Sequence, residues 1–171
     1  MYNYFYRQNP TPELMTQQLP TTPASPTVKL PYSQMQDLIS DMVELYHNEI
    51  RNMNMYQPLL ELSPNMEEEE IIQGIIDHTN NNILYLEQMY LGLTGDSIDK
   101  LAMPTEEFPN LSYTELLKNT LFSKTDTLEQ YEVLYRLIPI QAYKDMLFQM
   151  IIGQLKDATS SNYLISIQTQ I

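Results

Sequence analysis

The sequence contains no cysteine and very little glycine. Because none of the 171 residues is a cysteine, a disulfide framework, a thiolate metal site and a cysteine nucleophile are all excluded. Only four residues are glycine, whereas long stretches are rich in Leu, Ile, Met, Glu and Gln. This composition favours an all-α protein, since glycine weakens helices and these other residues form them well.

Basic residues are also scarce. The chain has nine Lys and Arg against 22 Asp and Glu, which gives a net charge of −13 and a pI of about 4.3. Phosphate recognition needs clustered Lys and Arg, so we expect no nucleic-acid partner, and an anionic membrane surface is disfavoured for the same reason. The sequence also lacks a signal-peptide pattern and an apolar run of about 18 residues. We therefore expect a cytoplasmic protein without a membrane partner.

The first part of the chain differs in composition from the rest. Residues 1–31 contain six of the eleven prolines, separated mainly by Gln, Thr and Ser, without a sustained apolar period. We expect residues 1–32 to form an extended or disordered arm and residues 33–171 to form the folded domain. The arm begins with an aromatic cluster, Met1–Tyr6, which either docks on a protein surface or has no role.

Helical periodicity predicts four helices in the domain. The first begins at a capping box, Ser33–Gln36, and ends before Ser63; the second follows Ser63-Pro64-Asn65 and ends at Thr94-Gly95. A second capping box opens the third helix, 112–137, and the fourth covers about 142–165. The connection at 96–110 is long for neighbouring helices, but it suffices to run the length of a bundle. The sequence thus predicts an antiparallel four-helix bundle with a long crossover between helices two and three.

Polar residues interrupt the apolar face of each predicted helix. They are Glu49 in the first helix, His78 and Asn81 in the second, Lys124 in the third, and Gln154 and Asp157 in the fourth. A buried polar group needs a hydrogen-bonding partner or a function. These residues are therefore either satisfied core groups or the remains of a site.

The spacing of these residues repeats between the two halves of the chain. His78 follows Glu49 after 29 positions, and Gln154 follows Lys124 after 30. In each second helix, an Ile-Ile doublet precedes a polar pair spaced i, i+3. The repeat predicts that the six residues converge at one level of the bundle.

This layout over Ser33–Ile165 resembles the ferritin-like superfamily. Within it, segments 74–95 (GIIDHTNNNILYLEQMYLGLTG) and 143–164 (YKDMLFQMIIGQLKDATSSNYL) are most similar to the rubrerythrin-like branch. In ferritin-like di-iron bundles, one helix of each hairpin supplies a Glu and the other supplies Glu-x-x-His. The resemblance implies that the six polar residues occupy the former ligand positions.

Most of those positions do not carry the family's ligands. Glu49 keeps the Glu, but His78 stands in place of a Glu and Asn81 in place of a His. Lys124, Gln154 and Asp157 stand in place of the third Glu, the fourth Glu and the second His. Two ferrous or ferric ions need several carboxylates, and an ammonium group would repel them. The resemblance therefore implies a degenerate member that has lost its di-iron centre, with Lys124 replacing the metal charge between Glu49 and Asp157.

Three classes of function remain open. The leading one is a non-catalytic structural or interaction protein, a pseudoenzyme without a cofactor; relatives in the spore coat extend this expectation to an association with spores. The second is a single iron, manganese or zinc ion held by Glu49, His78 and Asp157, in a storage or oxidative-stress role. The third is a small-molecule binding module. We expect protein partners, including a homodimer with Met55, Leu84 and Leu91 as extra contacts.

Overall fold

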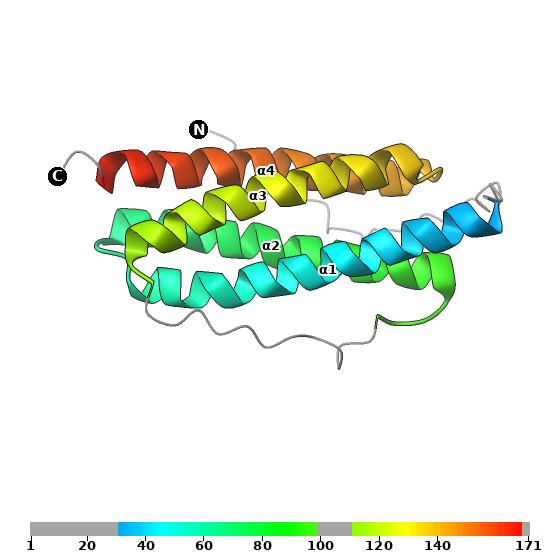
Figure 1. Ribbon diagram of the computed structural model, residues 1–171, viewed down its shortest axis with the longest axis horizontal. Coiled ribbons are helices and arrows are strands. Elements are labelled where there is room, and N and C mark those ends of the chain that lie inside the picture. Colours follow the sequence, from blue (N-terminus) through cyan, green and yellow to red (C-terminus); the bar gives the residue numbers. More distant parts are fainter. Residues whose placement is uncertain (1–30, 99–110, 169–171) are drawn as a thin grey trace, which may run out of the picture.

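The computed structural model describes residues 31–98 and 111–168. Four long α-helices account for nearly all of them (Figure 1). Their bounds are α1, Tyr32–Glu61; α2, Met66–Thr94; α3, Tyr113–Leu137; and α4, Gln141–Gln168. The predicted arm lies outside the described residues, apart from its last two positions.

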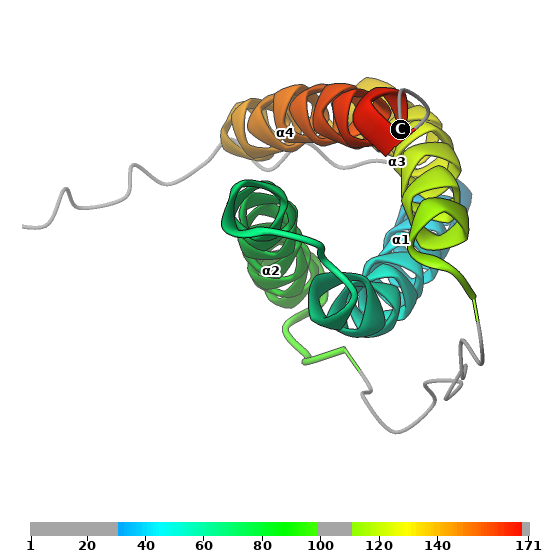
Figure 2. The same ribbon diagram turned by 90° about the vertical axis from the view of Figure 1, so that its left-hand side faces the viewer.

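The helices form the antiparallel four-helix bundle that the sequence predicts. Viewed from one end of the bundle, they follow the order α2, α1, α3, α4, and α2 packs less closely against α4 than any other neighbouring pair does (Figure 2). The end of α2 and the start of α3 lie at opposite ends of the bundle (Figure 1). The two helix ends that the connection joins are therefore separated by the length of the bundle, as the predicted crossover requires.

Local sequence signals explain most of the helix ends. The side chain of Asn65 accepts a hydrogen bond from the Glu68 backbone at the start of α2, and Gly95 ends that helix with a φ of 81°. Ser112 and Glu115 form the predicted capping box of α3. The capping box predicted at Ser33 is wrong: Pro31 is the N-cap of α1, with no side-chain capping bond. Pro31 is extended, with a φ of −52° and a ψ of 142°, and the helix begins at the next residue, Tyr32.

The interior consists of two apolar clusters. One of them includes Leu38, Met42, Leu86 and Leu147, and the other includes Leu59, Ile72, Leu117 and Leu164. Buried polar residues from all four helices lie between these groups in the sequence of every helix. The core is therefore apolar towards both ends of the bundle and polar at its middle.

The buried residues repeat along the chain with a constant offset of 75 positions. Adding 75 to Ile72, Ile75, Thr79, Asn82, Leu86 and Met89 gives Leu147, Met150, Gln154, Asp157, Ser161 and Leu164, which are the buried residues of α4. The same offset relates Met42, Glu49, Asn52, Tyr56 and Leu59 to the buried residues Leu117, Lys124, Thr127, Tyr131 and Leu134. The α1–α2 and α3–α4 hairpins thus share one burial pattern.

None of the described helices combines the length and the hydropathy that a bilayer-spanning helix needs.

Candidate functional site: a buried polar centre

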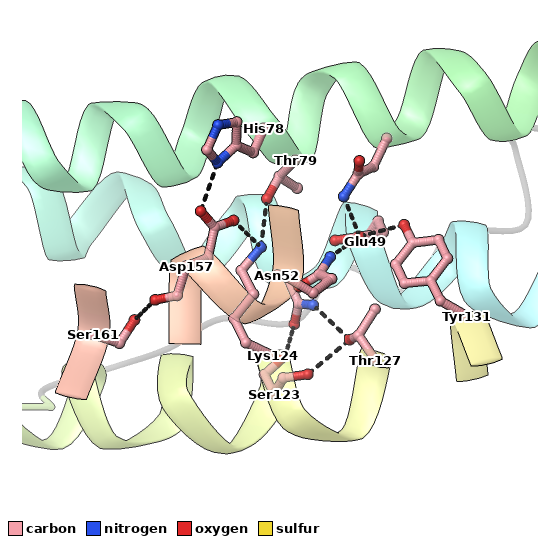
Figure 3. Close-up of polar contacts among 12 residues, drawn as sticks. Glu49, Asn52, His78, Thr79, Ser123, Lys124, Thr127, Tyr131, Asp157 and Ser161 are labelled. Carbon is pink, nitrogen blue, oxygen red and sulfur yellow. Dashed lines mark hydrogen bonds and ion pairs between the residues drawn. The ribbon is translucent and has the colours of Figure 1, made fainter. Parts of the chain in front are cut away.

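Eight buried side chains lie at the middle of the bundle and form what we call the polar centre. They are Glu49, Tyr56, Thr79, Asn82, Lys124, Tyr131, Gln154 and Asp157. Figure 3 labels five of them, namely Glu49, Thr79, Lys124, Tyr131 and Asp157. Each helix contributes two of the eight, and none is more than 4% exposed. A charge so far from water has to find its partners inside the protein.

The polar centre has two halves, and in the first of them Glu49 accepts the hydrogen bonds. Its Oε1 atom accepts hydrogen bonds from Tyr131 Oη at 2.6 Å, Gln154 Nε2 at 2.7 Å and Asn82 Nδ2 at 3.1 Å. These donors come from α3, α4 and α2, so one carboxylate oxygen links all four helices. Three donors to one charged oxygen offset much of the cost of burying the carboxylate.

In the second half, Lys124 is the hydrogen-bond donor. Its Nζ atom donates to Thr79 Oγ1 at 2.8 Å and lies 3.3 Å from Asp157 Oδ2. It also lies 5.2 Å from the centre of the Tyr56 ring, within the range of a cation–π contact. A hydroxyl, a carboxylate and an aromatic ring thus surround the ammonium group.

The two halves correspond under the 75-residue offset, with the roles of donor and acceptor exchanged. Glu49 corresponds to Lys124, and the Asn82–Glu49 hydrogen bond corresponds to the Asp157–Lys124 ion pair. Likewise, the Gln154–Glu49 bond corresponds to the Lys124–Thr79 bond. The Tyr131 contact with Glu49 corresponds to the Tyr56 contact with Lys124. One scaffold therefore holds an anion and a cation at equivalent positions.

His78 connects the polar centre to the surface. Its Nδ1 atom lies 2.6 Å from Asp157 Oδ1, and 32% of its side chain is exposed. If Asp157 is ionised, its carboxylate can only accept, and Nδ1 of His78 is then the donor in this contact. Asp157 thus uses one oxygen for His78 and the other for Lys124 (Figure 3).

Burial and charge alter the acidities of three groups in the polar centre. Burial opposes the positive charge of Lys124, but Tyr56, Glu49 and Asp157 outweigh it and raise the pKa of Lys124. Burial raises the pKa of Tyr56 to about 12, with Lys124 opposing the change. Burial, the charge of Glu49 and their hydrogen bond raise the pKa of Tyr131. All three groups therefore hold their protons to a higher pH in the folded protein than in the unfolded chain.

These shifts predict a loss of stability in alkali. Above about pH 10, Lys and Tyr side chains of the unfolded chain release protons that Lys124, Tyr56 and Tyr131 retain in the folded state. The folded state then binds more protons, so the free energy of unfolding falls as the pH rises. Their contribution is complete below pH 10, and each unit of raised pKa accounts for about 1.4 kcal/mol. Urea midpoints measured between pH 8 and pH 11.5 check this expectation.

Tyr131→Phe provides the variant for that experiment, and Tyr32→Phe provides its control. Tyr131 is fully buried, whereas Tyr32 is 79% exposed. We expect the urea midpoint of Tyr131→Phe to change less with alkaline pH than that of the natural protein, while Tyr32→Phe follows the natural protein. Equal pH dependence in all three proteins would show that Tyr131 does not contribute.

The structure places the six residues singled out in the sequence in different environments. Glu49, Lys124, Gln154 and Asp157 are buried together, and His78 touches Asp157 from a half-exposed position. Asn81 is exposed, so the expectation that it is buried is wrong. The neighbouring Asn82 takes the interior place and donates to Glu49.

Sequence reasoning left four residues out of the predicted site, namely Tyr56, Thr79, Asn82 and Tyr131. For α2, the constant offset between the two hairpins identifies the interior residues that the predicted site lacks. Lys124 and Gln154 are 30 positions apart, and the residue 30 positions after Glu49 is Thr79, not His78. The interior i, i+3 pair of α2 is accordingly Thr79 and Asn82, which corresponds to Gln154 and Asp157 in α4.

The carboxylate oxygens of the polar centre are mostly occupied by protein donors. Asp157 Oδ1 contacts His78, and Glu49 Oε1 accepts three hydrogen bonds. Among the described residues, neither Asp157 Oδ2 nor Glu49 Oε2 has a hydrogen-bond partner, but Asp157 Oδ2 forms the ion pair with Lys124. Within 31–98 and 111–168, no three His, Asp or Glu side chains are grouped so that they could hold a metal ion. Glu49, His78 and Asp157 therefore do not form the three-ligand group of the single-metal hypothesis.

Comparisons with known proteins support the fold. No protein-family model and no curated protein matches the sequence. A crystal structure of ferritin-like, diiron-carboxylate proteins from Bacillus anthracis is similar, with a TM-score of 0.67 and 15% sequence identity. The match covers 80% of this chain and 99% of that one. The chain therefore has a ferritin-like fold.

Proposed function

We propose that this protein is a non-catalytic ferritin-like module with a structural or interaction role, and that a protein charge network replaces a di-iron centre. The observation that carries the proposal is the position of Lys124. Its ammonium group is fully buried between a carboxylate, a hydroxyl and an aromatic ring. A fixed positive charge at the middle of the bundle repels metal cations and stabilises the nearby carboxylates in their place.

The available donor atoms support the same proposal. A di-iron centre needs bridging carboxylates, and the polar centre leaves one carboxylate oxygen, Glu49 Oε2, without a protein partner among the described residues. Gln154 and Asn82 supply neutral amides, which do not offset the charge of two metal ions. The residues present therefore do not fit a di-iron centre, and we assign no ferroxidase or oxygen-activating step to them.

The packing of the interior supports an interaction role more generally. Because buried side chains occupy the centre of the bundle, the surfaces remain as the parts available to partners. An association with spores, a membership of the rubrerythrin-like branch and a cytoplasmic location remain predictions from the sequence and its resemblance.

Metal analysis of the purified full-length chain tests the proposal. The protein is produced in iron-supplemented medium, dialysed without a chelator, and its iron, manganese and zinc are measured against protein concentration. We expect each metal far below one ion per chain. A near-stoichiometric amount of any of the three, retained in the natural protein and reduced in both Glu49→Gln and Asp157→Asn, would overturn the proposal in favour of a residual metal site.

A further inference from the structure

The outer face of α4 carries an apolar stripe at helical spacing. Phe148, Ile152, Leu155 and Tyr163 are between 46% and 49% exposed, and Thr159 continues the series between the last two. Steps of four, three, four and four positions place all five side chains on one face of the helix. The stripe is about 22 Å long, because a helix rises about 1.5 Å per residue.

The 75-residue offset provides an internal comparison for this face. The corresponding residues of α2 are Gln73, Asp77, Asn80, Leu84 and Gln88, all exposed. The two helices have equivalent places in the bundle and the same burial pattern. The fold therefore does not require apolar residues at these positions, since α2 fills four of the five with polar side chains. Packing within a single bundle therefore does not explain the apolar stripe on α4.

The two helices also differ in net charge. The α2 helix contains Asp and Glu but no Lys or Arg, whereas α4 contains two lysines, Lys144 and Lys156, and two aspartates, Asp145 and Asp157. Asp157 is buried against Lys124, so the exposed charges of α4 are not acidic overall. One carboxylate of α2 does reach the stripe, since Tyr163 Oη donates to Glu67 Oε1 at 3.3 Å. On a chain with a net charge of −13, a second acidic molecule is nevertheless repelled less at this face than at α2.

We propose that the outer face of α4 is the interface of a homodimer, in which two α4 helices pack antiparallel about a two-fold axis near Leu155. Residues equally distant from the axis then meet, so Phe148 of each copy faces Tyr163 of the other and Leu155 lies at the centre. A second copy offers the same apolar, non-acidic stripe, whereas a basic partner would be drawn to the acidic surface of α2. Met55, one of the dimer contacts expected from the sequence, is only 3% exposed and cannot serve in this way.

The proposal adds a partner to the interaction role, but it does not depend on the absence of metal from the polar centre. Sedimentation velocity of the full-length protein over a range of micromolar concentrations provides the test. We expect a reversible dimer in the natural protein, and Leu155→Glu should raise the dissociation constant about tenfold or more, because it places two carboxylates beside the axis. Phe148→Glu should weaken the dimer too, so the test does not rest on one variant. Asn80→Glu adds the same charge at the α2 position equivalent to Leu155, and it should leave the dimer unchanged.

Three results would overturn the proposal. The first is a natural protein that stays monomeric at high micromolar concentration. The second is a dimer that persists unchanged in both Leu155→Glu and Phe148→Glu, with circular dichroism showing that both variants are folded. The third is a monomer that dimerises only after residues 1–30 are removed, which would show that the N-terminal segment, not a second copy, covers the stripe. None of these results would affect the metal analysis, so the two proposals can fail separately.

Discussion

Replacing Lys124 with methionine is expected to lower the free energy of unfolding at pH 7 by about 3–5 kcal/mol, as for other buried ion pairs that lose one partner. Methionine keeps the length and the apolar bulk of lysine, so the loss reflects the missing charge and not a cavity. Asp157 would keep its contact with His78 but lose its buried counter-charge. In thermal unfolding, the change corresponds to a decrease of roughly 10 °C or more in Tm for a domain of this size.

Lys118→Met is the matched control for that experiment. Lys118 lies on the same helix as Lys124, but its side chain is exposed. The control should change the free energy of unfolding by no more than about 0.5 kcal/mol. The deficit of Lys124→Met should shrink towards pH 5, since a stranded carboxylate can be neutralised by a proton. A neutral effect of Lys124→Met from pH 5 to pH 8 would mean that Lys124 does not hold the polar centre together.

Restoring a complete set of di-iron ligands should create iron binding, provided that the ligands are placed in the interior register. The variant combines Thr79→Glu, Asn82→His, Lys124→Glu, Gln154→Glu and Asp157→His with the natural Glu49. This gives each hairpin a Glu on its first helix and Glu-x-x-His on its second. We expect about two iron ions per chain after anaerobic loading. Iron should also raise the Tm of this variant, because a ligand that binds only the folded state stabilises it.

A second variant tests the register itself. It carries the same changes at Lys124, Gln154 and Asp157 but uses His78→Glu and Asn81→His on α2. Since Asn81 is exposed, its replacement cannot reach the middle of the bundle, and this variant should bind less iron than the first. Stronger iron binding by the second variant would show that the interior face of α2 is assigned wrongly.

The fold could be predicted from the sequence because its signals are local and strong. Gly95, the capping box at Ser112 and the end of α3 at Leu137 all lie where the sequence places them. The length of the connection after α2 indicated the crossover. Ser33 misled because Ser-x-x-Gln has the form of a capping box, whereas the preceding Pro31 is the N-cap in the structure.

The polar centre was harder to predict because α2 is apolar over a wide face. Ile71, Ile72, Ile75 and Ile76 fit two helical phases that differ by one residue, or about 100° of rotation. The spacing of the apolar residues favours His78 on the interior face, whereas the structure buries Thr79 and leaves His78 half-exposed. Thr79 is also easily overlooked, because threonine is seldom singled out as a site residue. Comparing the two hairpins at a constant offset would have resolved the phase.

In the proposed function, Lys124 balances the charges of the polar centre in place of a metal. The most direct test compares the free energy of unfolding of Lys124→Met with that of the triple variant Glu49→Gln, Lys124→Met and Asp157→Asn at pH 7. Removing all three charges leaves no stranded carboxylate, so the triple variant should be more stable than the single one, although it carries two more substitutions. A triple variant that is less stable than Lys124→Met, by an amount equal to the separate losses of Glu49→Gln and Asp157→Asn, would contradict the claim.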